Sequence, residues 1–307
     1  FGRVFEAEAL SRDVLARDAG HAGSLHLLGV IAMQRGLFNE AVAHFRKAAE
    51  IRPDIAIGHH SLGKALAAAG RPDMAAAAFE HALTLKPDFA EAFKDLGLML
   101  VAQGRLKEAS ARFAQALELV PELAENFTDT IATLRTVNPA LGEAMARAAA
   151  AWPSAVPADQ LLGASGWAVV ADDPMLLGVL NITQVRGAGL EWFLTSLRAA
   201  VLDRAADAPD DVDESTLRFC CALAHQCFNN EYVFAESSRE IDLLERQKTM
   251  LLDALADGST IPPLRVAAVA SYCPLCSLPE PQRLLDRAWP DSVVKLLTRQ
   301  IREVDEE

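Results

Sequence analysis

The sequence predicts an all-α fold, in which an α-solenoid of repeated helix pairs is followed by a helical bundle. The first observation is a step of 34 residues in the first half of the chain, between Gly29, Gly63 and Gly97. The second is that apolar residues recur at helical spacing in both halves, without a useful run of alternating strand pattern. The third is composition, because 51% hydrophobic and only 6% aromatic residues suit closely stacked helices.

Six further columns keep the same step and define the extent of the solenoid. They are Leu28/Leu62/Leu96, Gly36/Gly70/Gly104, Ala41/Ala75/Ala109, Phe45/Phe79/Phe113, Ala48/Ala82/Ala116 and Pro53/Pro87/Pro121. The columns predict full repeats over 22–55, 56–89 and 90–123, preceded by the second helix of a truncated unit at 3–21. After Pro121 the step is lost, and we interpret 124–153 as a degenerate cap over the last apolar face. The predicted solenoid domain is therefore 1–153.

Each repeat is expected to form a helix, a turn and a second helix. In the first repeat, Gly36 ends the first helix because glycine tolerates left-handed backbone geometry. Ala41, Phe45 and Ala48 form the apolar stripe of the second helix, which Pro53 ends. Gly29 is small where the two helices cross, and we expect Phe45 to fill the space beside it.

These columns resemble the tetratricopeptide repeat, whose first helices line a concave groove that binds proteins or peptides. The resemblance implies that His26, His60 and Lys94, three residues before each repeat glycine, form a ladder along the groove. Lys64 lies one turn beyond His60 and adds positive charge. A cationic ladder favours an acidic peptide or a chain terminus. The alternative is that these residues are ordinary solvated positions on a helix face.

A neighbouring column tests a second resemblance. In O-linked N-acetylglucosamine transferases a similar array carries an asparagine ladder, whereas the matching column here is Leu27, Ser61 and Asp95. The asparagine ladder is absent, which weakens that analogy. A repeat module of a glycosyltransferase stays an alternative.

The second predicted domain, 154–307, is an all-helical bundle outside the repeat. We expect helices at 157–171, 174–184, 189–206, 214–234, 237–256, 263–271, 280–287 and 291–303. The segment 219–234 is apolar almost all round, which indicates a buried central helix. Its polar residues would then need internal partners; they are His225, Asn229, Asn230, Glu231 and Tyr232. They form either a buried network that fixes helix packing or a polar site of the domain's own.

The five cysteines all lie in the second half of the chain. Their odd number and the size of the chain argue against a secreted disulfide framework, and reduced thiols in a cytoplasm fit better. A weak alternative is a zinc site made by Cys220, Cys227, Cys273 and Cys276. We predict no metal, since Pro274 and Leu275 suit a helix–loop junction better than a zinc knuckle.

The net charge of −13 is concentrated in residues 154–307, which carry 24 acidic and 13 basic residues. Nucleic acid is therefore not expected as a partner, because binding phosphates requires a basic face. No run of 18 apolar residues predicts a membrane span. The partner is expected to be a protein or peptide, and self-association into a homo-oligomer is the other possibility.

A further resemblance covers the whole chain. Segments 194–198, 219–234, 267–275, 289–290 and 300–303 resemble bacterial proteins in which tetratricopeptide repeats precede a methyltransferase domain dependent on S-adenosylmethionine. The resemblance implies that this chain recruits a peptide or protein substrate to that domain. We expect the chain to be a piece of a longer protein, since it begins at Phe1 and ends at Glu307.

No catalytic residue is predicted within the chain itself. Gly163 and Gly166 lack the spacing and the preceding strand of a cofactor-binding turn, so S-adenosylmethionine is expected only in a downstream domain. No Ser/His/Asp order, phosphate loop or metalloprotease motif is present either. The alternative enzyme hypothesis places a site in the helical half, around His225 and Glu231.

Overall fold

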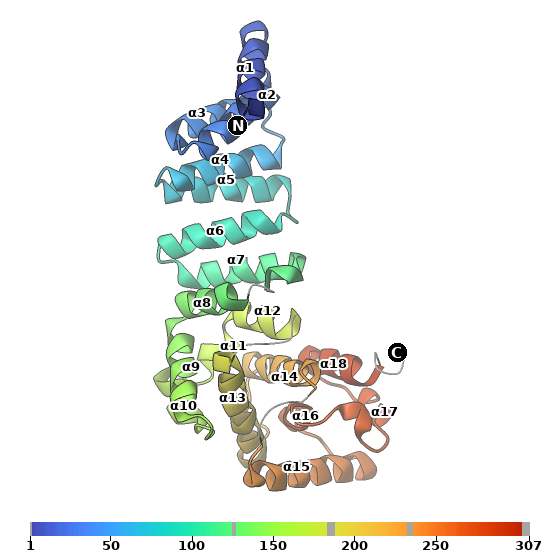
Figure 1. Cartoon of the computed structure of the whole chain (residues 1–307). Coiled ribbons are helices and arrows are strands. Elements are labelled where there is room, and N and C mark those ends of the chain that lie inside the picture. Colours follow the sequence, from blue (N-terminus) through green and yellow to red (C-terminus); the bar gives the residue numbers. More distant parts are fainter. Residues whose placement is uncertain (1, 125–126, 183–187, 232–235, 303–307) are drawn as a thin grey trace. The chain divides into compact units, whose positions relative to one another are not determined.

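The computed structural model describes residues 2–124, 127–182, 188–231 and 236–302. Within these ranges every regular element is a helix and none is a strand, which confirms the all-α prediction. The chain divides into two compact units, Phe1–Val120 and Pro121–Glu307. Each unit is described separately (Figure 1).

The first unit consists of α1 (Gly2–Arg17) and three helix pairs. The pairs are α2 (Ala22–Gln34) with α3 (Phe38–Ile51), α4 (Ala56–Ala68) with α5 (Pro72–Leu85), and α6 (Ala90–Ala102) with α7 (Leu106–Leu119). The two helices of a pair pack together, and α3 packs on α4 as α5 packs on α6. The predicted repeats are thus confirmed as successive antiparallel layers (Figure 1).

A close contact between a glycine and a phenylalanine joins the two helices of every pair. A Cβ atom built on Gly29 would lie 2.7 Å from the ring of Phe45. The corresponding distances are 2.5 Å from Gly63 to Phe79 and 2.8 Å from Gly97 to Phe113. All are shorter than real Cβ contacts, so only glycine permits the observed approach of these helices.

The turn between the helices of each pair also repeats. Gly36, Gly70 and Gly104 all have φ of 73°, the left-handed conformation expected of a glycine that ends a helix. The next residue donates its backbone N–H across the last turn at 2.9 Å, from Leu37 to Ala32, Arg71 to Leu66 and Arg105 to Leu100. This bonding pattern is the Schellman motif, and it satisfies carbonyl groups that the helix end would otherwise leave open.

The second unit holds the remaining helices. They are α8 (Phe127–Val137), α9 (Pro139–Ala151), α10 (Ala158–Leu162), α11 (Ala168–Ala171), α12 (Pro174–Ile182), α13 (Ala188–Asp207), α14 (Glu214–Asn229), α15 (Ser238–Asp257), α16 (Pro263–Ala270), α17 (Gln282–Leu285) and α18 (Asp291–Leu297). Short 3-10 turns lie between some of them, and a π-helical turn, Thr298–Arg302, follows α18. The core forms where α13 and α14 pack on α16, and α12 and α18 cover α14.

Three sequence predictions differ from this arrangement. The expected helix at 157–171 is broken into α10 and α11, because Gly163 and Gly166 take positive φ values of 65° and 54°. Helix α14 ends at Asn229 rather than at 234. The units divide after Val120, so α8 and α9, which the sequence analysis had grouped with the solenoid in 1–153, belong to the second unit.

A buried arginine lies at the centre of the second unit. Arg198 on α13 is 0% exposed, and its guanidinium carbon lies 4.2 Å from the centroid of the Tyr272 ring. Its guanidinium nitrogens lie 3.7 Å and 3.8 Å from carboxylate oxygens of Glu236 and Glu240. The Tyr272 hydroxyl donates a hydrogen bond of 2.7 Å to Glu240. These contacts tie α13, the start of α15 and the end of α16 together.

The Tyr272 phenol should make this unit sensitive to alkali. Burial raises the pKa of Tyr272, since the phenolate would be desolvated and would face Glu240. When folding raises the pKa of a group, the unfolded state releases its proton first as the pH rises. The stability that the protonated group provides is therefore complete below the unfolded-state pKa and falls above it. We expect the free energy of unfolding to fall above about pH 10, and to fall less in Tyr272→Phe. Urea unfolding across alkaline pH measures this; parallel pH curves would contradict it.

Candidate functional site

The first helices of the three repeats present one continuous set of equivalent positions. Residues 23, 26, 27 and 30 of α2 correspond to 57, 60, 61 and 64 of α4 and to 91, 94, 95 and 98 of α6, because the step is 34 residues. Their spacing of three and four places them on one side of each helix. Exposed side chains among them include Leu27, Ile57, Lys64, Lys94 and Leu98. We call these five residues the first-helix face.

His60 belongs to the same columns but lies inside the stack. It is only 9% exposed, and its Nε2–H donates a hydrogen bond of 2.9 Å to the Asp95 carboxylate of the next repeat. Its ring also packs 5.5 Å from the ring of Phe79 and 4.7 Å from that of Phe89, between centroids. His60 therefore joins consecutive repeats and is not open to a ligand as the ladder prediction required.

His26 is half-buried and also contributes little charge. Its ring meets Phe45 edge-on at a centroid distance of 5.0 Å. Burial lowers the pKa of His26, which disfavours the imidazolium form. The predicted cationic ladder is accordingly corrected to two exposed side chains, Lys64 and Lys94, between exposed aliphatic residues.

The predicted polar network of the second unit is only partly buried. His225 is 7% exposed, and Asn229 donates to its Nε2 at 3.1 Å. Gln226, which is fully buried, donates to Asn230 at 3.2 Å. Asn229 and Asn230 are half-buried, whereas Glu231 is exposed at the helix end, so its predicted burial is wrong. Tyr232 lies outside the described residues.

The cysteines remain thiols and form no cluster in the described part of the chain. Cys220, Cys221 and Cys227 are buried on α14, and Cys273 and Cys276 lie half-buried near η3 (Leu275–Ser277). No group of three or more His, Cys, Asp or Glu side chains that suits a metal ion occurs among the described residues. The structure therefore does not bring together the four cysteines of the zinc alternative.

Thiol chemistry is also disfavoured by the setting of these residues. Burial raises the pKa of Cys221 to about 12, and that of Cys227 likewise to about 12. The reactive thiolate is thus scarce at neutral pH. Neither thiol offers a nucleophile for covalent catalysis.

Models of known protein families match the sequence of most of the first unit. Two models, both described as tetratricopeptide repeat, match residues 20–88 and 66–125. Residues 20–125 carry tetratricopeptide repeats. The match supports a protein–protein interaction module, and it covers the whole first-helix face.

Solved structures of other repeat proteins show similarity to part of the chain. MamA is 23% identical, with a TM-score of 0.40, over 45% of this chain and 76% of that one. YrrB, described as a TPR protein with an unusual peptide-binding site, is 23% identical, with a TM-score of 0.39, over 45% of this chain and 67% of that one. No curated protein matches. In the described ranges, no helix is long and apolar enough to cross a membrane.

Proposed function

We propose that the tetratricopeptide repeats bind an extended protein segment that carries both apolar and acidic side chains. The observation that carries this proposal is the first-helix face, where Leu27, Ile57 and Leu98 are exposed together with Lys64 and Lys94. Exposed aliphatic side chains on the same side of neighbouring first helices offer an apolar contact to a ligand. The two lysines select a ligand by charge.

The two lysines lie on neighbouring first helices. Lys64 is on α4 and Lys94 on α6, and these two helices contact each other directly. The carboxylate nearest to Lys94 in sequence, Asp95, accepts a hydrogen bond from His60 and is thus engaged within the stack. Glu91, also on α6, is the exposed acidic residue of these columns. Its negative charge weakens the attraction of this face for an acidic ligand.

Reversing both lysine charges should abolish most binding. We expect Lys64→Glu with Lys94→Glu to weaken binding of acidic, apolar peptides about tenfold or more, since each lysine would then repel the ligand. Binding is measured by fluorescence anisotropy on hits from a peptide array. The matched control is Lys47→Glu with Lys107→Glu, two exposed lysines on the second helices α3 and α7. Equal losses in both double variants, or none in the first, would count against the face as the binding site.

A finer proposal concerns what the bound segment is for. The resemblance of segments such as 194–198 and 267–275 to repeat proteins with a methyltransferase domain supports recruitment of a methylation substrate. In that case a partner captured through Lys64 and Lys94 carries methylated side chains in its native host. Mass spectrometry of partners that depend on these two lysines tests the idea, and a set of unmethylated partners would refute it.

A further inference from the structure

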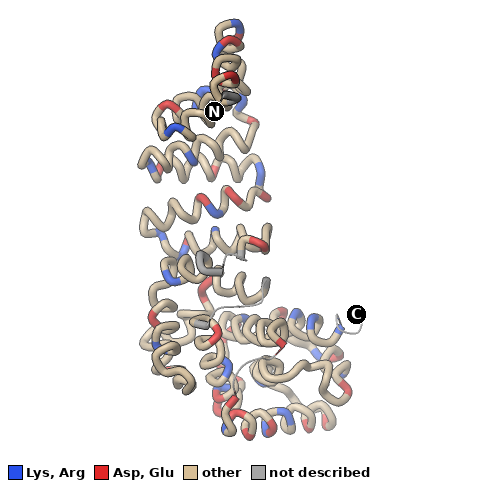
Figure 2. Tube along the Cα trace, viewed as in Figure 1, with Lys and Arg blue, Asp and Glu red and all other residues tan. Residues whose placement is uncertain are grey.

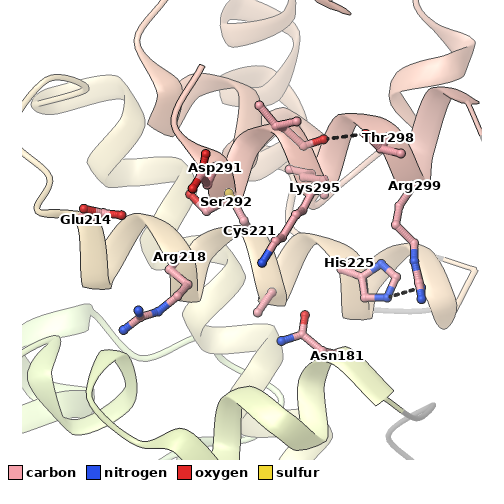
Figure 3. A pocket seen from close by; sticks show the side chains of 13 residues that line it. Asn181, Glu214, Arg218, Cys221, His225, Asp291, Ser292, Lys295, Thr298 and Arg299 are labelled. Carbon is pink, nitrogen blue, oxygen red and sulfur yellow. Dashed lines mark hydrogen bonds between the residues drawn. The ribbon is translucent and has the colours of Figure 1, made fainter. Parts of the chain in front are cut away.

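A cavity of about 610 Å³ in the second unit is lined by residues of α12, α14 and α18 (Figure 3). Its wall includes Asn181 from α12, Cys221 and His225 from α14, and Lys295 and Arg299 from α18 and the π-helical turn. This volume falls within the range of small-molecule sites in proteins. The cavity lies outside the tetratricopeptide repeats and has no part in the proposed function.

Charged side chains from two helices face this cavity at helical spacing. Helix α14 contributes Glu214 and Arg218, followed by His225, while α18 and the turn after it contribute Asp291, Lys295 and Arg299. Figure 3 shows Glu214 and Asp291 toward one end of the cavity and His225 and Arg299 toward the other. Glu214 and His225 are about 16 Å apart along the helix axis, at 1.5 Å per residue. The two carboxylates therefore lie toward one end of the cavity, with Arg218 one helical turn from Glu214, while Lys295 and Arg299 lie farther along it.

Basic residues are scarce in this part of the protein. Residues 154–307 carry 13 basic and 24 acidic residues, yet three of the basic ones line this cavity. Figure 2 shows Lys and Arg along α18 and the turn that follows it. An anion is therefore expected to bind at this cavity in preference to other parts of the domain surface, because positive charge exceeds negative charge at the cavity while the domain as a whole is acidic.

Arg218 and Lys295 are available to a ligand. Both are exposed, and neither forms an ion pair with any residue that the structure describes. Other cations of the unit behave differently, because Arg239 pairs with Asp203 and Lys248 with Glu245. An anion entering the cavity would therefore not have to displace a carboxylate from either side chain.

The buried His225 helps to position the third cation. Its Nε2 accepts a hydrogen bond from Asn229 at 3.1 Å and lies 3.4 Å from Nη1 of Arg299. Both neighbours are donors, so Nε2 is the acceptor and Nδ1 carries the proton. His225 is thus a positioning residue that holds the Arg299 guanidinium at the cavity wall (Figure 3).

We propose that this cavity binds a small anion whose phosphate or carboxylate groups contact Arg218, Lys295 and Arg299. Charge-assisted bonds from guanidinium and ammonium groups are the strongest that such a group can receive from side chains. Glu214 and Asp291 accept hydrogen bonds from hydroxyl or amino groups at the other end of the ligand. A second anionic group at that end would be repelled by the two carboxylates.

Isothermal titration of the whole chain with pyrophosphate and with citrate tests the proposal at constant ionic strength. We expect a saturable site, and the preferred probe tells phosphate from carboxylate chemistry. Arg218→Gln with Lys295→Gln should weaken the affinity about tenfold or more, since two charge-assisted contacts are lost. The control, Arg246→Gln with Lys248→Gln on α15, changes the net charge equally and should bind as the unmodified chain does.

Three results would overturn the proposal. The first is that neither pyrophosphate nor citrate binds at millimolar concentration. The second is that the two double variants lose the same amount of affinity, and the third is that the cavity variant keeps its full affinity. The circular dichroism and melting temperature of the cavity variant should match those of the unmodified chain, because Arg218 and Lys295 are exposed and form no ion pair among the described residues. A loss of affinity therefore reports on the site and not on unfolding.

Discussion

Gly63→Ala is expected to lower the free energy of unfolding of the repeat unit by about 3 kcal/mol, as overpacking of a well-filled core does. The new methyl carbon would lie 2.5 Å, 2.7 Å and 2.9 Å from three carbons of the Phe79 ring. Phe79 is 0% exposed, so its ring has no room to move away. Helices α4 and α5 must then separate, which weakens the packing of both neighbouring repeats.

Two probes allow the effect to be assigned to the repeats. All 4 tryptophans lie after residue 120, so their fluorescence reports on the second unit, whereas far-ultraviolet circular dichroism reports on all helices. Gly63→Ala should shift the urea midpoint of the dichroism and leave that of the fluorescence in place. Hydrogen exchange should rise in α4 and α5 first.

A second glycine on the same helix gives the control for this prediction. A Cβ atom on Gly58 would meet nothing within 4 Å, so Gly58→Ala should raise stability by up to about 1 kcal/mol through helix propensity alone. Adding Phe79→Leu to Gly63→Ala should restore part of the loss, because the smaller side chain makes room for the methyl group. Similar effects of the two glycine variants would show that the close approach is not what requires glycine at 63.

Arg198→Ala is expected to destabilise the second unit by about 4 kcal/mol, the cost of leaving one side of a buried ion pair without its partner. Glu240 is 8% exposed, and without Arg198 its charge would face a cavity beside Tyr272. Arg198→Lys should lose part of the stability as well, since an ammonium group cannot stack on the Tyr272 ring as a planar guanidinium does.

The control for this prediction is an exposed ion pair in the same unit. Arg239 binds Asp203 at 2.8 Å with its side chain 76% exposed, and Arg239→Ala should cost under about 1 kcal/mol. Urea unfolding followed by tryptophan fluorescence measures both variants. If Arg198→Ala cost no more than Arg239→Ala, the buried contacts of Arg198 would not be a source of stability.

Features that repeat in sequence were predictable, and features made by single residues were not. The 34-residue step located the helix pairs, the left-handed glycine at each turn and the contact between Gly29 and Phe45. The same step grouped His60 with Lys94, although His60 is buried and Lys94 is exposed. The difference arises from Asp95, in the next repeat, and from Phe89, at the end of the same repeat, which no column comparison relates to His60.

In the second unit the sequence pattern was less informative because it carries no repeat. Apolar periodicity continues through Gly163 and Gly166, so their positive φ values and the break between α10 and α11 were not foreseen. Arg198 lies in an apolar stretch of α13, but its partners are 38 residues or more away and its burial depends on them. Of the cavity residues, His225 was a predicted site candidate, but Arg218, Lys295 and Arg299 were missed for a similar reason, since α14 and α18 are far apart in the chain.

The glycine–phenylalanine contacts have a consequence for how such a chain changes over generations. Each contact lies wholly within one repeat, as between Gly63 and Phe79, so a copied segment such as 56–89 brings its own complete helix pair with it. Duplication or loss of one segment therefore lengthens or shortens the array by a whole layer without requiring new compensating substitutions inside it. The number of layers is therefore free to vary by gene recombination alone.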